Sequence, residues 1–457
     1  MSDDLDRIEE IINAAGVADL ELLLPTGVRP RQLRLTTLLI GMTLTARAGR
    51  PAFMRAVHTT LTVLPESVQR RLGVIAPWKH GEHRLTYRQV EYTFDRLTSV
   101  LAKDQPDGTP SEQLHDLLDR LLEASVQVLG EPASSSYAVD WTDHETWSLP
   151  PPKKPASDSA PAAGENQPPP DCADPEAAWG RRRRHTPGEK DELFYGYYLQ
   201  AVTAVNDEHG PQVPELARRM HLVSCDHDPP PALVPVLQRT HTDGIPITDL
   251  LADSGYSYRV PETWALPIRA LGIDLIQDLH PNDRGPHGTH HGAIINNGAL
   301  YCPTTPTTLL ALGPLHRAAT SEQTAAHDQQ SAELARYKLS PISRPDPDGY
   351  HRVICPAAQG KLRCPHQPAS MTLPNDRPTI LDPPQHPPVC CTQQTMTVPP
   401  SVNAKTAQKH DYPSPAHRVS YNRRTAAERT FSTIKDPATT DISRGWCRLI
   451  VGGHRKW

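Results

Sequence analysis

Apolar residues recur every three to four positions along the first 130 residues, which is the spacing of amphipathic helices. In the first such stretch, Leu5, Ile8, Ile11 and Ile12 fall on one helical face. Segments rich in Gly and Pro separate the stretches. We therefore expect an all-α domain over 1–130. Its predicted helices cover 3–14, 31–48, 65–72, a segment beginning at 86, and 116–129.

The pattern changes at residue 135, beyond which shorter apolar runs alternate with helical stretches. Residues 135–142 and 194–205 carry the Tyr, Val and Thr that are typical of strands. Residues 232–242 have a helical pattern, and another short apolar run ends at Asp253. The segment 268–279 repeats the alternation of helix and strand. This order of elements predicts an α/β domain.

Proline divides this second domain. The chain has 49 Pro in 457 residues, about twice the average share. Nine of them lie in 149–175 and ten in 365–400. We therefore predict a Pro-rich and basic loop over 149–192 and an irregular insertion containing Pro and Cys over 301–414. The α/β core is then split between 131–300 and 415–457.

Charge is distributed unevenly, although the net charge is only −5. Residues 26–103 hold 13 Lys and Arg against 4 Asp and Glu, and residues 401–457 hold 11 against 4. Four consecutive arginines, Arg181, Arg182, Arg183 and Arg184, form a further basic cluster. Basic helical segments suit contacts with nucleic-acid phosphates, although a solvated helix face gives the same pattern. The net charge therefore does not exclude a DNA partner.

Several classes of protein are excluded or disfavoured. No run of about 18 apolar residues occurs, so we expect no membrane partner. The acidic N-terminus lacks the features of a secretory signal, which favours a cytoplasmic location and reduced cysteines. No phosphate-binding loop or nucleophile elbow is present. Cys355, Cys364, Cys390 and Cys391 have spacings that suit zinc poorly, which favours free thiols.

Acidic residues at three places suggest chemistry. Asp140 and Asp253 each end an apolar run, and carboxylates at strand ends of an α/β sheet lie where active sites form. Asp143 is an alternative to Asp140. On a helix over 421–435, the residues Tyr421, Arg424, Glu428 and Lys435 would share one face, as they also would on a solvated amphipathic helix. A third carboxylate from this helix would complete a hard-oxygen site for Mg²⁺.

The spacing Tyr-x2-Arg-x3-Glu-x6-Lys at Tyr421, Arg424, Glu428 and Lys435 resembles the C-terminal signature of the DDE transposases of bacterial insertion sequences. Residues 135–260 and 420–450 resemble this family, with the acids in its order of Asp, Asp and Glu. The resemblance implies an RNase H-like mixed-sheet core. In it, Asp140, Asp253 and Glu428 would hold two Mg²⁺ or Mn²⁺ ions that promote strand cleavage and strand transfer.

The same resemblance implies the partners. Tyr421, Arg424 and Lys435 would contact double-stranded DNA near the scissile phosphate, at transposon ends and at the target. The four arginines 181–184 would clamp phosphates or form a solvated loop. The protein would act in the cytoplasm at the nucleoid, and a homodimer is one possible oligomeric state. Two alternatives use the same residues, namely an inactive transposase-derived DNA-binding protein and a metal-dependent nuclease.

Overall fold

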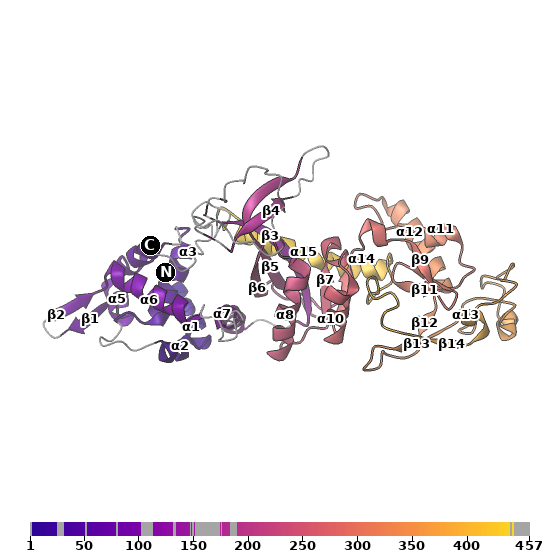
Figure 1. Cartoon of the computed structure of the whole chain (residues 1–457), viewed down its shortest axis with the longest axis horizontal. Helices are drawn as coiled ribbons and strands as arrows, with labels where there is room; N and C mark the ends of the chain where they lie inside the picture. Colours follow the sequence, from indigo (N-terminus) through magenta and orange to yellow (C-terminus); the bar gives the residue numbers. More distant parts are fainter. Residues whose placement is uncertain are drawn as a thin grey trace, which may run out of the picture.

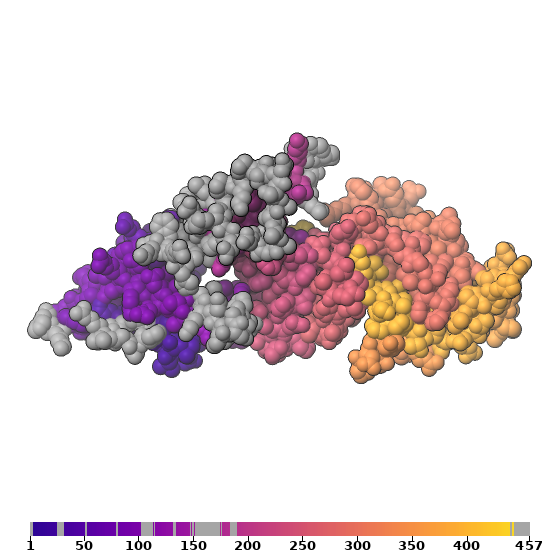
Figure 2. Space-filling view, in the orientation of Figure 1, coloured from indigo at the N-terminus to yellow at the C-terminus, as the bar shows by residue number. Residues whose placement is uncertain are grey.

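The computed structural model describes residues 2–24, 32–50, 53–78, 81–101, 113–130, 134–146, 148, 150, 174, 176–182, 190–438 and 441–442. Three parts follow one another along the longest axis of the molecule: a mainly helical N-terminal unit, a central sheet with its helices, and the insertion (Figure 1). The space-filling view shows the same succession (Figure 2), and the yellow helices near residues 415–434 run from the insertion back to the central sheet (Figure 1).

Amphipathic helices build the N-terminal unit around one apolar core. Leu35, Leu38, Leu61 and Val90 are fully buried in it, and each such side chain contributes roughly 1.5–3 kcal/mol. The helices are α1 (Ser2–Ala14), α2 (Val17–Leu23), α3 (Leu35–Arg47), α4 (Met54–Thr62), α5 (Glu66–Arg71), α6 (Tyr87–Leu101) and α7 (Gln113–Leu129). Five of them match predicted helices, whereas the short helices α2 and α4 were not predicted.

The N-terminal unit is not entirely helical. A hairpin of β1 (Ile75–Trp78) and β2 (Gly81–Arg84) lies between α5 and α6. Pro77 cannot continue a helix, because it has no backbone N–H to donate. The two strands are only four residues long and mostly exposed, so they show no alternation of apolar and polar residues. The all-α prediction is therefore wrong at this hairpin.

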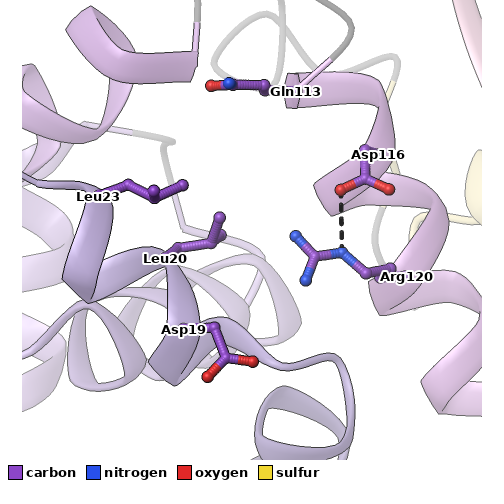
Figure 3. A pocket seen from close by; sticks show the side chains of 6 residues that line it. All are labelled: Asp19, Leu20, Leu23, Gln113, Asp116 and Arg120. Atoms are coloured by element: carbon purple, nitrogen blue, oxygen red, sulfur yellow. Dashed lines mark ion pairs between the residues drawn. The ribbon is translucent and has the colours of Figure 1, made fainter.

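Figure 3 shows a hollow between α2 and α7 in this unit, into which Leu20 and Leu23 project. Arg120 forms an ion pair of 3.1 Å with Asp116 on its wall. None of the residues lining the hollow belongs to the acidic and basic residues predicted to form a site. Among the described residues, no helix has the length and apolar character needed to cross a bilayer.

A mixed six-stranded sheet forms the centre, as expected for an α/β domain. Its order is β4-β5-β3-β7-β8, and β6 pairs with the same edge of β5 as β4 does. β3 pairs antiparallel with β5 and parallel with β7, which pairs parallel with β8. The strands are β3 (Ser136–Glu145), β4 (Ala178–Arg182), β5 (Glu192–Val205), β6 (Ala217–Ser224), β7 (Asp249–Ala252) and β8 (Asp274–Gln277).

The alternation of side chains along β3 separates the two faces of the sheet. Tyr137 and Val139 pack under the helices α8 (Pro229–Thr242) and α10 (Ala265–Ala270). Ala138 faces the C-terminal helix α15 (Thr425–Ile434), where it meets Ala426 and Ala427. These small side chains allow α15 to approach the sheet closely. The short segments α9 (Ser254–Ser257) and η1 (Pro261–Thr263) lie between β7 and α10.

The insertion is more regular than predicted. Helix α12 (Ser321–Tyr337) begins with a capping box of Thr320 and Gln323, and two small sheets accompany it. Only four of its residues are buried, so its apolar pattern in the sequence is weak. The other elements between β8 and the end of the insertion are η2 (Pro281–Asp283), β9 (Pro286–His290), β10 (Ala293–Asn296), β11 (Ala299–Tyr301), α11 (Thr307–Leu310), β12 (Ser340–Pro341), β13 (His351–Ile354), η3 (Pro368–Thr372), α13 (Val389–Thr392) and β14 (Thr395–Val398).

The prediction of irregular backbone holds best for 365–400, where turns and bends dominate. The boundary predicted at residue 300 is also displaced. Strands β10 and β11 pack against apolar residues of the insertion, including Leu334 and Val353, and not against the central sheet. The insertion therefore begins near β9.

Candidate active site

Strand register brings Asp140 and Asp253 to the same level of the sheet. The last parallel pair joins Ala138 of β3 to Leu251 of β7, and each aspartate lies two residues beyond that pair. β3 itself continues past Asp140 to Glu145 along β5, so the prediction that Asp140 ends its strand is wrong. What ends near Asp140 is the pairing with β7.

Asp253 is held by the turn that follows β7. Its Oδ1 accepts a hydrogen bond of 2.8 Å from the backbone N–H of Gly255, which caps α9. A Cβ on Gly255 would lie 2.7 Å from the ring of Trp141, so only glycine fits there. Trp141 packs edge-on against Tyr256 at 4.7 Å, and Tyr256 lies 4.8 Å from Trp264. The motif Asp-Ser-Gly-Tyr thus supplies both the carboxylate and an aromatic wall beside it.

The C-terminal segment reaches the two aspartates through a break in its helix. Helix α14 (Pro415–Tyr421) ends at Tyr421, a 3₁₀ turn η4 (Asn422–Arg424) follows, and α15 then begins. The single helix predicted over 421–435 is therefore wrong. The break places Arg424 between the sheet and α15, where it is only 7% exposed.

Arg424 connects the predicted acids. Its Nη1 lies 3.4 Å from Oδ2 of Asp140, and its Nη2 donates to Oε1 of Glu428 one turn further along. Asp253 lies close enough for its charge to act on the same guanidinium. Arg424, which the resemblance assigned to DNA, therefore pairs with the carboxylates in this structure. Asp140, Asp253 and Glu428, from three distant segments, lie around one cation.

Burial makes ionisation of the two aspartates costly. Burial first, and then the neighbouring charge of Asp253, raise the pKa of Asp140 to about 6, although Arg424 opposes both. Burial likewise raises the pKa of Asp253, and Arg424 again counteracts it. Half of the Glu428 side chain remains exposed. A site that raises carboxylate pKa values in this way is typical of functional positions.

This electrostatic strain predicts a stability gain for Asp140→Asn. The ordinary aspartate pKa is near 3.9, so the folded chain binds more protons than the unfolded chain between about pH 4 and pH 6. Folding stability is therefore lost as pH rises through that window. Measured by urea unfolding in EDTA, the variant should be more stable than the wild type by about 2 kcal/mol at pH 7.5 and equally stable at pH 4.

Asp143→Asn is the matched control on the same strand, because its shift has the opposite sign. Burial would raise the pKa of Asp143, but the hydrogen bond from Arg182 and the charge of Lys435 lower it overall. This variant should lose stability at pH 7.5 and match the wild type at low pH. If Asp140→Asn were the less stable of the two at pH 7.5, Arg424 would outweigh burial and our account of the site would be wrong.

The remaining basic residues have specific partners. Lys435 donates to Oγ1 of Thr142 at 2.5 Å and lies 3.6 Å from Asp143. Arg182 contacts Asp143 at 2.5 Å and Glu145 at 3.0 Å, so this arginine is engaged within the protein. Asp143, the alternative carboxylate, is held between these two cations.

Arg181 and Tyr421 are the other two residues predicted to contact DNA that the structure describes. Arg181 is 69% exposed and lies 3.7 Å from Asp191, whereas Arg183 and Arg184 lie outside the described residues. Tyr421 stacks on His417 with ring centroids 5.6 Å apart, and Arg424 lies over its ring. Burial raises the pKa of Tyr421, so its phenol stays protonated.

Sequence reasoning missed Asp278, which follows β8 as Asp253 follows β7. Its carboxylate accepts a hydrogen bond of 2.7 Å from Tyr412 and lies 3.3 Å from Arg284. Its charge acts on both Asp253 and Tyr421. The same signal that identified Asp140 and Asp253, an acid after a short apolar run, is present in residues 273–278.

The carboxylates suit a divalent metal by their chemistry, since Mg²⁺ prefers oxygen ligands. Within the ranges that the structure describes, no three His, Cys, Asp or Glu side chains are arranged to hold a metal ion. Arg424 instead supplies the positive charge between Asp140 and Glu428. A metal held by these carboxylates would have to replace contacts that Arg424 now makes.

In comparisons with known proteins, no family model, no curated protein and no solved structure matches the chain. The site is therefore interpreted from its own geometry.

Proposed function

We propose that this protein is a DDE-type DNA transposase that cleaves and joins DNA strands with two Mg²⁺ or Mn²⁺ ions. The observation that carries the proposal is the gathering of Asp140, Asp253 and Glu428 around Arg424 at one edge of the parallel strands. The resemblance over 135–260 and 420–450 predicts these same three acids. The mixed sheet, with acids beyond the ends of its parallel pairing, supports an RNase H-like core.

In this proposal, Asp140 and Asp253 would hold the metal from the sheet and Glu428 from α15. The bound ions would stabilise the attacking and leaving oxygens of the phosphodiester. Arg424 keeps the carboxylates charge-compensated before DNA binds. The rings of Trp141 and Tyr256 pack against each other on one side of the acids. Lys435, held at Thr142 beside the same strand, would position a DNA phosphate.

The N-terminal unit offers the surface for DNA. Arg55, Arg84 and Arg88 are exposed on α4, β2 and α6. Other basic residues there are partly neutralised, since Arg47 and Arg71 form ion pairs with Asp4 and Asp6 of the acidic helix α1. Phosphate contacts from exposed arginines would supply affinity that falls steeply with salt.

The test is a strand-transfer assay with the full chain. A linear duplex carrying the two DNA segments that flank the coding sequence is incubated with a target plasmid and Mg²⁺. We expect cleavage at the segment ends and products joined to the plasmid, both abolished by EDTA. Cleavage without joined products would make the protein a nuclease. Salt-dependent binding without any cleavage in Mg²⁺ or Mn²⁺ would make it a transposase-derived DNA-binding protein.

A further inference from the structure

Two consecutive arginines at the break before α15 are held in very different ways. Arg423 donates from Nε to the carbonyl of Ser420 at 3.0 Å, and from Nη1 to the carbonyl of Asn206 at 2.7 Å. Its Nη2 donates to the hydroxyl of Ser420 at 2.6 Å and lies 3.2 Å from the carboxylate of Asp249. Every nitrogen of this guanidinium is therefore engaged, and Arg423 anchors the C-terminal segment to the sheet.

Arg424 is also buried, at 7% exposed, but its partners are fewer and weaker. Its Nη1 lies 3.4 Å from Oδ2 of Asp140, beyond the usual span of a charge-assisted hydrogen bond, about 2.7–2.9 Å. Its buried Nε has no hydrogen-bond partner among the described residues. Nη2 makes a close contact with Glu428, whose side chain is 50% exposed. This guanidinium thus keeps N–H donors with which it can bind a further anion.

The charge of the acidic cluster, Asp140, Asp253 and Glu428, cannot accommodate both Arg424 and the metal ions of the proposed function. Two divalent ions already carry more positive charge than the three carboxylates carry negative charge. An arginine that stayed buried beside them would be strongly repelled, because screening is weak in a buried place. Arg424 must therefore leave the carboxylates when the ions bind.

A DNA phosphate is the partner that suits the displaced guanidinium. Arginine binds phosphate oxygens with two parallel N–H donors, which makes such pairs strong and specific in geometry. The buried Nε of Arg424, which has no hydrogen-bond partner within the described part of the chain, and one of its Nη groups could form this pair. The substrate would then provide the anion that the acidic cluster provides in the free protein.

We propose that Arg424 is a displaceable counter-cation that makes metal binding at the acidic cluster conditional on DNA. In the free protein, its guanidinium compensates the carboxylates and excludes divalent ions. A DNA phosphate binds the guanidinium, and the carboxylates then become free to act as ligands. This ordering explains why the acids of the described chain do not already form a ligand set. The inference rests on the proposed function, since it concerns the same acids and the same substrate.

The test measures Mn²⁺ binding to the full chain without DNA, from the electron paramagnetic resonance signal of the free ion. Arg424→Gln removes the cation and should bind Mn²⁺ at least roughly tenfold more tightly than the wild type. Arg424→Lys keeps the charge and should bind as weakly as the wild type. Arg429→Gln is the matched control, because it removes the same charge from an exposed position on α15 where Arg429 pairs with Glu215. It should leave the affinity for Mn²⁺ unchanged.

A second measurement needs no variant, so it remains decisive if Arg424→Gln fails to fold. Adding the duplex with the DNA segments that flank the coding sequence should raise the affinity of the wild type for Mn²⁺ by a similar factor, after subtraction of the ions that the DNA alone binds. Wild-type protein that cleaves DNA but binds Mn²⁺ equally tightly with and without it overturns this inference and leaves the proposed function intact. Protein that binds DNA but binds no Mn²⁺ in either state overturns both.

Discussion

Asp140→Ala, Asp253→Ala and Glu428→Gln should each reduce DNA strand cleavage by at least roughly a thousandfold, while DNA binding survives. Each change removes one of the three carboxylates that gather around Arg424. Loss of even an outer-shell partner of a metal ligand costs about 10–100-fold, so loss of a ligand itself should cost more. The measurement is single-turnover cleavage of an end-labelled duplex in Mg²⁺, beside a gel-shift assay for binding.

Two further variants make this prediction specific. Glu215→Gln removes the partner of Arg429, the residue that follows Glu428 on α15, and should leave cleavage unchanged. Asp143→Asn tests the alternative first carboxylate and should retain much more cleavage than Asp140→Ala. Cleavage that persists in all three variants of the acidic cluster would remove the proposed mechanism. Cleavage lost in Asp143→Asn but not in Asp140→Ala would transfer the role to Asp143.

Arg219→Met should destabilise the protein by about 3–5 kcal/mol, because it removes one of the two arginines that lie beside the buried carboxylate of Asp119. The Arg219 side chain is 2% exposed and lies 2.7 Å from Asp243, 3.5 Å from Asp119 and 3.9 Å from Glu123. Burial already raises the pKa of Asp119. Without Arg219, the arginine beside this carboxylate would be Arg239, at 3.6 Å. The contacts with Asp119 and Glu123 join α7 of the N-terminal unit to β6 of the sheet, and the contact with Asp243 joins β6 to the end of α8. For a chain of 457 residues that unfolds as one unit, scanning calorimetry should show a fall in melting temperature of about 3–5 °C.

A double variant separates the ion pair from the packing. Replacing both buried partners, as in Arg219→Met with Asp119→Leu, should recover much of the lost stability, since apolar groups of similar size often replace buried ion pairs without loss. Arg47→Ala is the surface control, because its ion pair with Asp4 is largely exposed and should contribute nothing measurable. If Arg219→Met melted with the wild type, α7 would not be held to β6 through these charges.

The buried acids of the acidic cluster lower the stability of the fold, whereas the buried ion pairs of Arg219 raise it. Asp140 and Asp253 are held in a place where ionisation is unfavourable, whereas Arg219 and Asp249 are buried with full sets of opposite charges. Asp249 lies 2.7 Å from Lys409 and 3.2 Å from Arg423, residues of the segment that returns from the insertion. Such ion pairs fix the returning chain beside the sheet, so that Arg424 and Glu428 arrive opposite the aspartates.

The local patterns of the sequence determined most elements and the identity of the acids. The helical spacing around Leu5, the strand ending in Val205 and the apolar runs before Asp140 and Asp253 all depend on residues a few positions apart. For that reason they could be predicted without the fold. The hairpin at 75–84 and helix α12 were missed because they bury too few residues to leave a regular pattern.

Only the tertiary structure decided which distant residues meet. That Arg424 pairs with Asp140 and that Arg182 is engaged by Asp143 depends on strand register and on packing between segments far apart in the sequence. The break at 422–424 was also invisible in the sequence, because residues 421–435 alone suit a continuous helix. Side-chain periodicity reports which face of an element is buried, but not what lies against that face.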